Sequence, residues 1–196
     1  MSISPGRVTY FSPRSEAERV MTTQPDRDPR LTHVSIVAAD VEESTAFYED
    51  VVGCRRVPTP EFGRQRDFDA EADIGFQILR VGDHQLHLWN DPAHEVEAIR
   101  FAHFGIHVDD FEAVYRRAED REAFAAIGVG SAPPQVFDFN GTAQMYLRDP
   151  TGNLVEIDYP DIDELDRSAF AEVVTRETSG PDIGTYTEAV LGSIRR

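Results

Sequence analysis

The fold is decided by two matching stretches, His33-Val-Ser-Ile-Val-Ala-Ala-Asp40 and His103-Phe-Gly-Ile-His-Val-Asp-Asp110. Seventy residues separate the two histidines, and seventy separate the two aspartates. The segment around His87 recurs 69 residues later around Glu156. An offset that stays nearly constant over these landmarks indicates that one small structural unit occurs twice in the chain.

Each copy begins with a strand that leads into a helix. In the first copy, Val34 and Ile36 alternate with polar neighbours, so they share one face while His33 takes the other. Asp40 is a suitable N-cap for the helix that follows, and Gly53 is a suitable end. The second copy has the same order, with a helix capped by Asp109 or Asp110.

Further strands complete each copy. They are expected near residues 55–62, 75–81 and 85–90 in the first copy, and near 135–139, 143–148 and 154–159 in the second, whose opening strand is expected near 103–108. Gly82-Asp83 and Asn140-Gly141 are typical hairpin turns. The fold class is therefore α+β, with paired βαβββ modules that form an open eight-stranded half-barrel cup.

Four segments follow from this pattern: an N-terminal extension (1–30), a first module (31–94), a second module (95–160) and a C-terminal helical extension (161–196). The first thirty residues contain four prolines and no clear period. In the last segment, short amphipathic helices are expected near 169–174 and 186–194, as packing or dimerisation elements.

Composition excludes several classes of partner. The chain has 36 acidic and 19 basic residues, a formal charge of −17, which argues against nucleic acid or anionic lipid. It has no apolar run long enough to span a membrane and no signal-peptide pattern. The single cysteine, Cys54, rules out an intrachain disulfide and is expected to be a buried structural thiol. A cytoplasmic location is the default expectation.

Four residues at equivalent positions carry the chemistry. Strand alternation places His33 and His103 on the face away from the helices, and the same argument holds for His87 and Glu156. Burying three imidazoles and a carboxylate without partners would cost several kcal/mol. One divalent ion would satisfy all four and fix their protonation. Such ligands suit Zn, Ni, Co, Mn or Fe(II), and the sequence does not choose among them.

Two motifs resemble the vicinal oxygen chelate superfamily. They are the opening His-x-x-Ile-x-x-x-Asp with Phe47-Tyr48 and Gly53, and the closing Arg148-Asp-Pro-Thr-Gly-Asn-Leu-Val-Glu156. That superfamily includes glyoxalase I, methylmalonyl-CoA epimerase, fosfomycin-resistance transferases, extradiol ring-cleaving dioxygenases and bleomycin-binding proteins. The resemblance implies a glyoxalase-like fold and a small-molecule substrate. It also implies that His33, His103 and Glu156 are metal ligands, with His87 at a fourth ligand position.

His87 departs from the glyoxalase-like pattern, which has Glu there, and from the epimerases, which have Gln. If His87 is a ligand, the resemblance favours lyase or isomerase chemistry with Glu156 as the base. If it is not, His33, His103 and Glu156 form the triad of a non-haem Fe(II) ring-cleaving dioxygenase, with His87 or His107 as the acid or base.

A third interpretation is a small-molecule binding or resistance protein without catalysis. Trp89 and Tyr146 are candidate substrate contacts, although aromatic residues on strands are first of all core residues. A homodimer is compatible with every interpretation. Whether the two modules pair within one chain or between two chains stays open.

Overall fold

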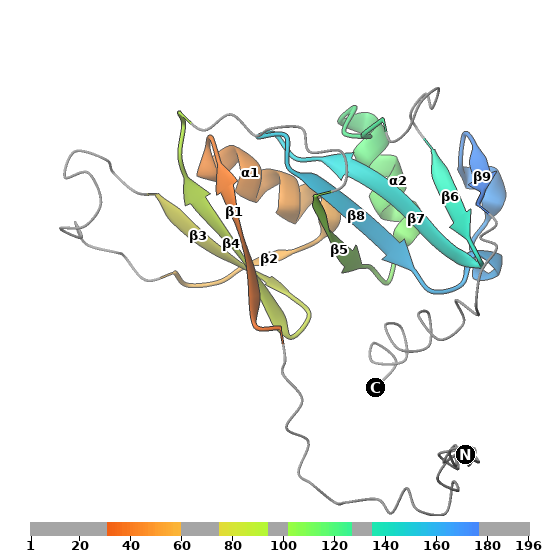
Figure 1. The fold of residues 1–196 in the computed structure, drawn as a ribbon, viewed down its shortest axis with the longest axis horizontal. Helices are drawn as coiled ribbons and strands as arrows, with labels where there is room; N and C mark the ends of the chain where they lie inside the picture. Colours follow the sequence, from red (N-terminus) through yellow and green to blue (C-terminus); the bar gives the residue numbers. More distant parts are fainter. Residues whose placement is uncertain (1–30, 60–74, 94–101, 127–134, 177–196) are drawn as a thin grey trace, which may run out of the picture. The chain divides into compact units, whose positions relative to one another are not determined.

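The computed structural model describes residues 31–59, 75–93, 102–126 and 135–176 of the 196-residue chain. The described residues form two β-sheets, and each sheet has a helix against one face (Figure 1).

The first sheet has four strands in the order β1-β4-β3-β2. Their bounds are β1 His33–Ala38, β2 Arg55–Arg56, β3 Phe76–Val81 and β4 His84–Asn90. Helix α1 (Val41–Phe47) follows β1 and continues as the π-helical turn η2 (Tyr48–Val52). The helix contacts β3 and β4.

The second sheet has five strands in the order β5-β8-β7-β6-β9. Their bounds are β5 His103–His107, β6 Val136–Phe139, β7 Thr142–Arg148, β8 Leu154–Tyr159 and β9 Val173–Thr175. Helix α2 (Phe111–Asp120) follows β5 and contacts β8. Strand order and helix placement therefore repeat those of the first sheet.

The register confirms the internal repeat. β1 pairs with β4 in parallel and places Ser35 opposite His87. β5 pairs with β8 in parallel and places Gly105 opposite Glu156, at the equivalent step. The α+β fold of paired βαβββ modules is thus confirmed.

Both helices begin where capping chemistry predicts. Asp40 accepts a hydrogen bond from the backbone N–H of Glu43 at 2.9 Å, and Asp110 accepts one from the N–H of Ala113 at 2.9 Å. Gly53 ends η2 with a φ of +94°, a conformation that favours glycine. Cys54 follows it and is buried. Burial raises the pKa of the Cys54 thiol to about 12, so it is a structural, unreactive thiol, as expected.

The core lies between the sheets and their helices. In each module, the neighbours of the predicted ligand on its strand are fully or almost fully buried: Leu86 and Leu88 around His87, and Val155 and Ile157 around Glu156. This burial leaves the opposite face of each sheet for polar side chains.

Two expectations about the elements were wrong. Instead of a helix near 169–174, the chain has 3-10 turns at Ile162–Glu164 and Arg167–Ala169, followed by β9, which pairs with β6 in parallel. The β-branched run Val173–Thr175 prefers a strand, and the edge of β6 supplies backbone partners for it. The strand expected over 55–62 is described only as Arg55–Arg56.

Other expectations fall outside the described residues: the extension 1–30, the module boundary at 94–95 and the helix near 186–194. Among the residues that are described, no helix is long and apolar enough to cross a bilayer.

Candidate functional site

The first sheet carries a pair of stacked histidines. The rings of His33 on β1 and His87 on β4 lie 4.3 Å apart, with an angle of 7° between their planes. His87 Nε2 lies 2.9 Å from the side-chain oxygen of Gln85, and His33 Nδ1 lies 3.0 Å from the Thr32 hydroxyl. Burial lowers the pKa of His87, and the nearby His33 lowers it further. Both effects favour the neutral imidazole, which is the form that binds metals.

An aromatic row extends from this histidine pair. The Phe76 ring meets His87 edge to face, with centroids 5.3 Å apart, and lies 4.2 Å from the Trp89 ring. Trp89 and Phe76 are half-buried, so part of each ring remains accessible. Sequence reasoning considered Trp89 but missed Phe76, because a phenylalanine at the start of a strand gives no signal beyond a core position.

The second sheet carries a pair formed by a histidine and a carboxylate. His103 Nε2 on β5 lies 2.6 Å from Glu156 Oε2 on β8. The Tyr146 hydroxyl on β7 donates to the other Glu156 oxygen at 3.0 Å, and its ring packs against His103. The Glu156 carboxylate, 11% exposed, therefore has one oxygen held by tyrosine and one directed at the imidazole.

Sequence reasoning missed Asp158. It lies two residues beyond Glu156 on the same face of β8, and burial together with the Glu156 charge raises its pKa to about 7. A Cβ atom on Gly105 would lie 2.9 Å from Asp158 Oδ2, so the glycine leaves the space that this carboxyl occupies. The available signal was the period of two from Glu156, which puts the two carboxyls side by side.

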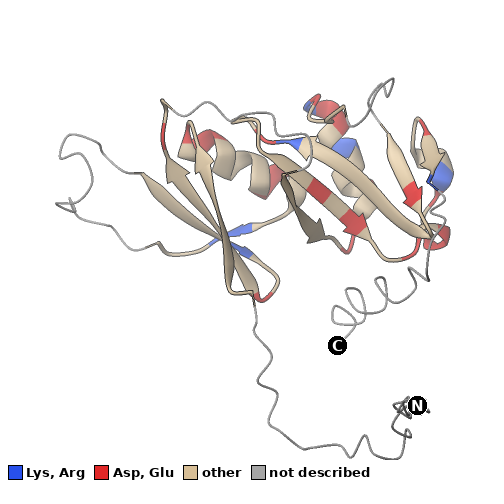
Figure 2. Cartoon of the chain, in the orientation of Figure 1, with Lys and Arg blue, Asp and Glu red and all other residues tan. Residues whose placement is uncertain are grey.

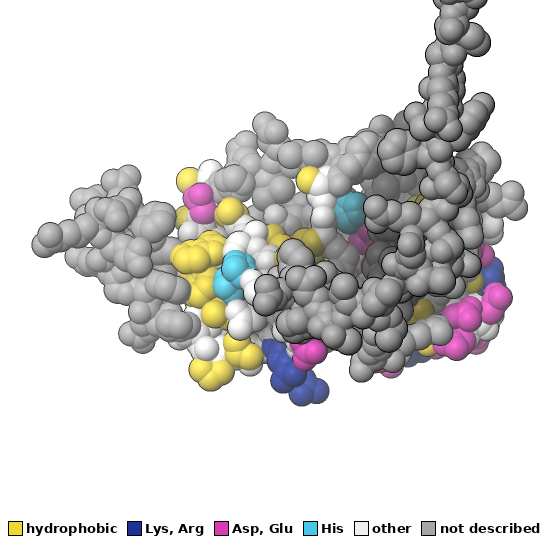
Figure 3. Space-filling model, turned by 60° about the horizontal axis from the view of Figure 1, so that its bottom comes forward, with side chains coloured by type: hydrophobic (Ala, Val, Ile, Leu, Met, Phe, Trp, Pro, Cys, Tyr) yellow, Lys and Arg dark blue, Asp and Glu magenta, His cyan; other side chains and the backbone are white. Residues whose placement is uncertain are grey.

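The four predicted ligands are brought together in two pairs. His33 and His87 belong to the first sheet, whereas His103 and Glu156 belong to the second. Figure 3 shows histidine side chains at two separate places, one of them bordered by hydrophobic side chains. Within the part of the chain that the structure describes, no group of three or more potential ligands gathers around one point.

His107 lies apart from both pairs. Its Nδ1 atom is buried and has no hydrogen-bond partner among the described residues, and its Nε2 atom lies 3.7 Å from an Asp109 oxygen. The ring stacks against Tyr159. His107 lines a pocket of about 600 Å³ whose lining includes none of the four predicted ligands.

The closing Asp-Pro-Thr-Gly-Asn turn ties the two modules together. The buried Asp149 carboxylate accepts hydrogen bonds from the Tyr48 hydroxyl of the first module at 3.0 Å and from the Asn153 side chain at 2.8 Å. The Asn153 side chain also donates to the backbone carbonyl of Val37 at 2.9 Å, and Thr151 accepts from the N–H of Ala39. The motif therefore fixes the end of β1 next to the start of β8.

A family model describes most of this architecture. The model of the Glyoxalase/Bleomycin resistance protein/Dioxygenase superfamily matches residues 30–157. No curated protein matches the chain.

Solved structures with a similar fold include the oxidase ChaP-H2, 20% identical, with a TM-score of 0.51 over 66% of this chain and 92% of that one. Lactoylglutathione lyase from Agrobacterium tumefaciens is 22% identical, with a TM-score of 0.42 over 67% and 93%. Fosfomycin resistance protein FosX from Mesorhizobium loti is 21% identical, with a TM-score of 0.44 over 65% and 89%. At these identities the likeness concerns the fold, and the chemistry must be argued from the site.

Proposed function

Because the chain belongs to the Glyoxalase/Bleomycin resistance protein/Dioxygenase superfamily, we propose that it is a divalent-metal enzyme acting on a small substrate with vicinal oxygens. The observation that carries the proposal is the His103–Glu156 pair at 2.6 Å, on the face opposite the core, with the His33–His87 pair at the equivalent position of the other module. Three imidazoles and one carboxylate are a donor set suited to Zn, Ni, Co, Mn or Fe(II).

We infer that the two pairs come from two copies of the chain. The Asp149 network holds the modules of one chain together, and Arg117 adds a bond to the Val51 carbonyl at 2.9 Å. With the modules in this arrangement, the four residues do not gather around one point in the described part of a single chain. A homodimer in which the first module of one copy faces the second module of the other would keep these contacts and complete the ligand set, with two equivalent sites per dimer.

The favoured reaction is a proton transfer of the lyase or isomerase type. When bound, a divalent ion would supply Lewis-acid polarisation of a substrate carbonyl. Glu156 is the candidate base, because its carboxylate faces the site while Tyr146 holds one of its oxygens in a fixed direction. Asp158, whose carboxyl lies beside Glu156 and whose pKa is raised by burial and by the Glu156 charge, could hold a proton next to this base.

The aromatic row supports a second candidate, a ring-cleaving Fe(II) dioxygenase. Phe76 and Trp89 lie next to His87 with partly accessible rings, and a planar aromatic substrate could stack on them. His33, His103 and Glu156 would then be the iron ligands, and His87 would act as the acid or base.

Metal analysis of protein purified without chelator tests the proposal. We expect about one divalent ion for each set of four ligands. Zn, Ni or Co without oxygen uptake would favour the lyase or isomerase. Iron together with oxygen uptake on catechols would favour the dioxygenase. A folded protein that neither retains nor rebinds a divalent ion would contradict both.

A further inference from the structure

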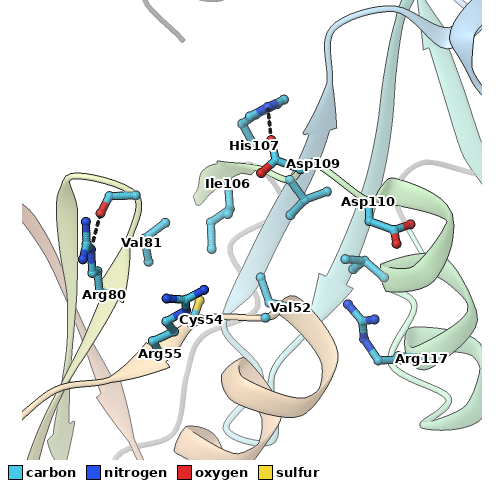
Figure 4. A pocket seen from close by; sticks show the side chains of 14 residues that line it. Val52, Cys54, Arg55, Arg80, Val81, Ile106, His107, Asp109, Asp110 and Arg117 are labelled. Carbon is cyan, nitrogen blue, oxygen red and sulfur yellow. Dashed lines mark hydrogen bonds and ion pairs between the residues drawn. The ribbon is translucent and has the colours of Figure 1, made fainter. Parts of the chain in front are cut away.

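A pocket of about 600 Å³ lies away from the predicted metal ligands. It is bordered by β2, the turn between β3 and β4, the end of β5 and the beginning of α2 (Figure 4). This volume falls in the usual range of small-molecule sites. The pocket therefore has room for a ligand of its own.

Three arginines from three elements line this pocket. They are Arg55 on β2, Arg80 on β3 and Arg117 on α2, against two aspartates, Asp109 and Asp110. The chain as a whole has a net charge of −17. Figure 2 shows basic residues on β2, whereas α1 and β8 carry acidic ones. The local excess of positive charge points to an anionic ligand.

None of these three arginines forms an ion pair within the described ranges. The arginines that do have carboxylate partners lie elsewhere: Arg56, Arg121 and Arg167. Arg55 lies directly opposite Arg80 in the antiparallel register of β2 and β3. Like charges in this position are destabilising, and an anion bound between them would remove the repulsion.

Two of the guanidinium groups are held in place by the backbone. Arg80 Nε donates to the Gly82 carbonyl at 2.8 Å, and Arg117 Nε donates to the Val51 carbonyl at 2.9 Å. Both bonds use Nε, which leaves the terminal NH₂ groups for a ligand. In Figure 4, Arg55 and Arg117 extend into the space between β2 and α2.

The two aspartates of the pocket are already engaged. Asp110 caps α2, and the exposed Asp109 carboxylate lies near His107 Nε2. His107 adds a buried Nδ1 atom without a partner in the described residues. The remaining wall is apolar: Val52, Val81, Ile106, Val108 and Val114.

We propose that this pocket is a second binding site, which takes a small organic anion whose carboxylate or phosphate group is bound by Arg55, Arg80 and Arg117 and whose apolar body lies against the valine-rich wall. The site is separate from the metal centre of the proposed function and does not depend on it. A guanidinium can bind either oxyanion through two parallel hydrogen bonds. Comparing a phosphate probe with a carboxylate probe shows which of the two groups the pocket prefers.

Calorimetric titration of the full-length protein tests this proposal with three probes that share a phenyl ring: phenyl phosphate, phenylacetate and neutral benzyl alcohol. At least one anion is expected to bind about tenfold or more tightly than benzyl alcohol. Arg55→Gln and Arg80→Gln should each weaken binding of that anion by about tenfold, as expected for loss of a charge-assisted hydrogen bond. Arg121→Gln, at an arginine paired with Asp50 outside the pocket, should leave it unchanged.

Thermal unfolding gives a second readout. Without ligand, Arg80→Gln should unfold at the same temperature as the unsubstituted protein or higher, because the substitution removes the repulsion from Arg55. At the same concentration, the anion should raise the unfolding temperature of the unsubstituted protein more than that of the variant. The proposal is overturned if neither anion binds, if benzyl alcohol binds equally well, or if Arg121→Gln weakens binding as much as Arg80→Gln.

Discussion

The two modules differ in chemistry at His87, because the equivalent position in the second module is a glutamate, Glu156. Strand alternation predicted the face of both residues, and the registers of β4 and β8 agree with it. The stacking of His33 on His87 could not be predicted, because it depends on side-chain rotamers and not on strand phase. The contact between Asp158 and Glu156 could not be predicted for the same reason, because it also depends on side-chain rotamers.

Replacing His87 with alanine tests its role in metal binding. If His87 is a ligand, we expect metal affinity to fall by about 10- to 100-fold or more, since loss of even an indirect partner has an effect of that size. The measurement is competition with a chelator of known affinity. His84→Ala is the matched control, because His84 is exposed and lies on the same strand, with its side chain on the face opposite to that of Gln85 and His87. Equal affinities in the two variants would remove His87 from the ligand set.

Asp158 predicts a pH dependence of stability in the metal-free protein. The pKa of Asp158 is raised to about 7 in the folded state. Between about pH 4 and pH 7, this carboxyl therefore keeps a proton in the folded protein that it has lost in the unfolded chain. Stability should therefore decrease as the pH rises through this window. Asp158→Asn should reduce the loss of unfolding free energy between pH 5 and pH 8 by about 1–3 kcal/mol, measured by urea denaturation with chelator present.

The control for this experiment is Asp83→Asn, in the exposed turn between β3 and β4, which should keep the pH dependence of the unsubstituted protein. If Asp158→Asn has the same pH dependence of stability as the unsubstituted protein, the Asp158 carboxyl does not hold a proton at neutral pH.

At the level of elements, the sequence predicted the order of strands and helices in the two modules, although the strand expected over 55–62 is described only as Arg55–Arg56. The period of two, the Asp40 and Asp110 caps and the Asn140-Gly141 turn are local signals, and they act over a few residues. β9 was missed because its strand conformation depends on pairing with β6, whose paired residues lie 37 positions earlier in the chain. The Asp149 turn was identified as a motif, but its bond to Tyr48 joins residues 101 positions apart.

Tyr48→Phe tests whether that bond stabilises the joined modules. The substitution removes the hydroxyl that donates to Asp149 in a buried setting, so we expect a loss of about 1–2 kcal/mol in unfolding free energy. Tyr159→Phe removes an exposed hydroxyl bonded to Glu164 and should cost less than about 0.5 kcal/mol. Urea denaturation at neutral pH compares the two. Equal losses would mean that the Asp149 network does not hold the modules.

At the scale of the whole molecule, the repeat explains both the fold and the separation of the two pairs of proposed ligands. The two modules place equivalent side chains on equivalent faces, but each sheet carries only half of the proposed donor set. Sequence reasoning could name the four residues because strand phase is local. It could not say whether they meet within one chain, because that depends on how the modules pack.

The proposed metal centre is assembled from the His33–His87 pair of one copy and the His103–Glu156 pair of another. A chain carrying His33→Ala with His87→Ala, and a chain carrying His103→Ala with Glu156→Gln, would each lack half of the set. Produced alone, each should lose bound metal while keeping its fold by circular dichroism. Produced together with two different affinity tags, mixed dimers can be isolated by purifying on both.

The decisive measurement is the metal content of these mixed dimers. One of their two sites contains all four native ligands, so we predict about half of the metal per chain that the unsubstituted protein holds. Metal-free mixed dimers beside a metal-loaded unsubstituted protein would contradict assembly between copies. Full metal content in either parent variant would contradict the ligand set itself.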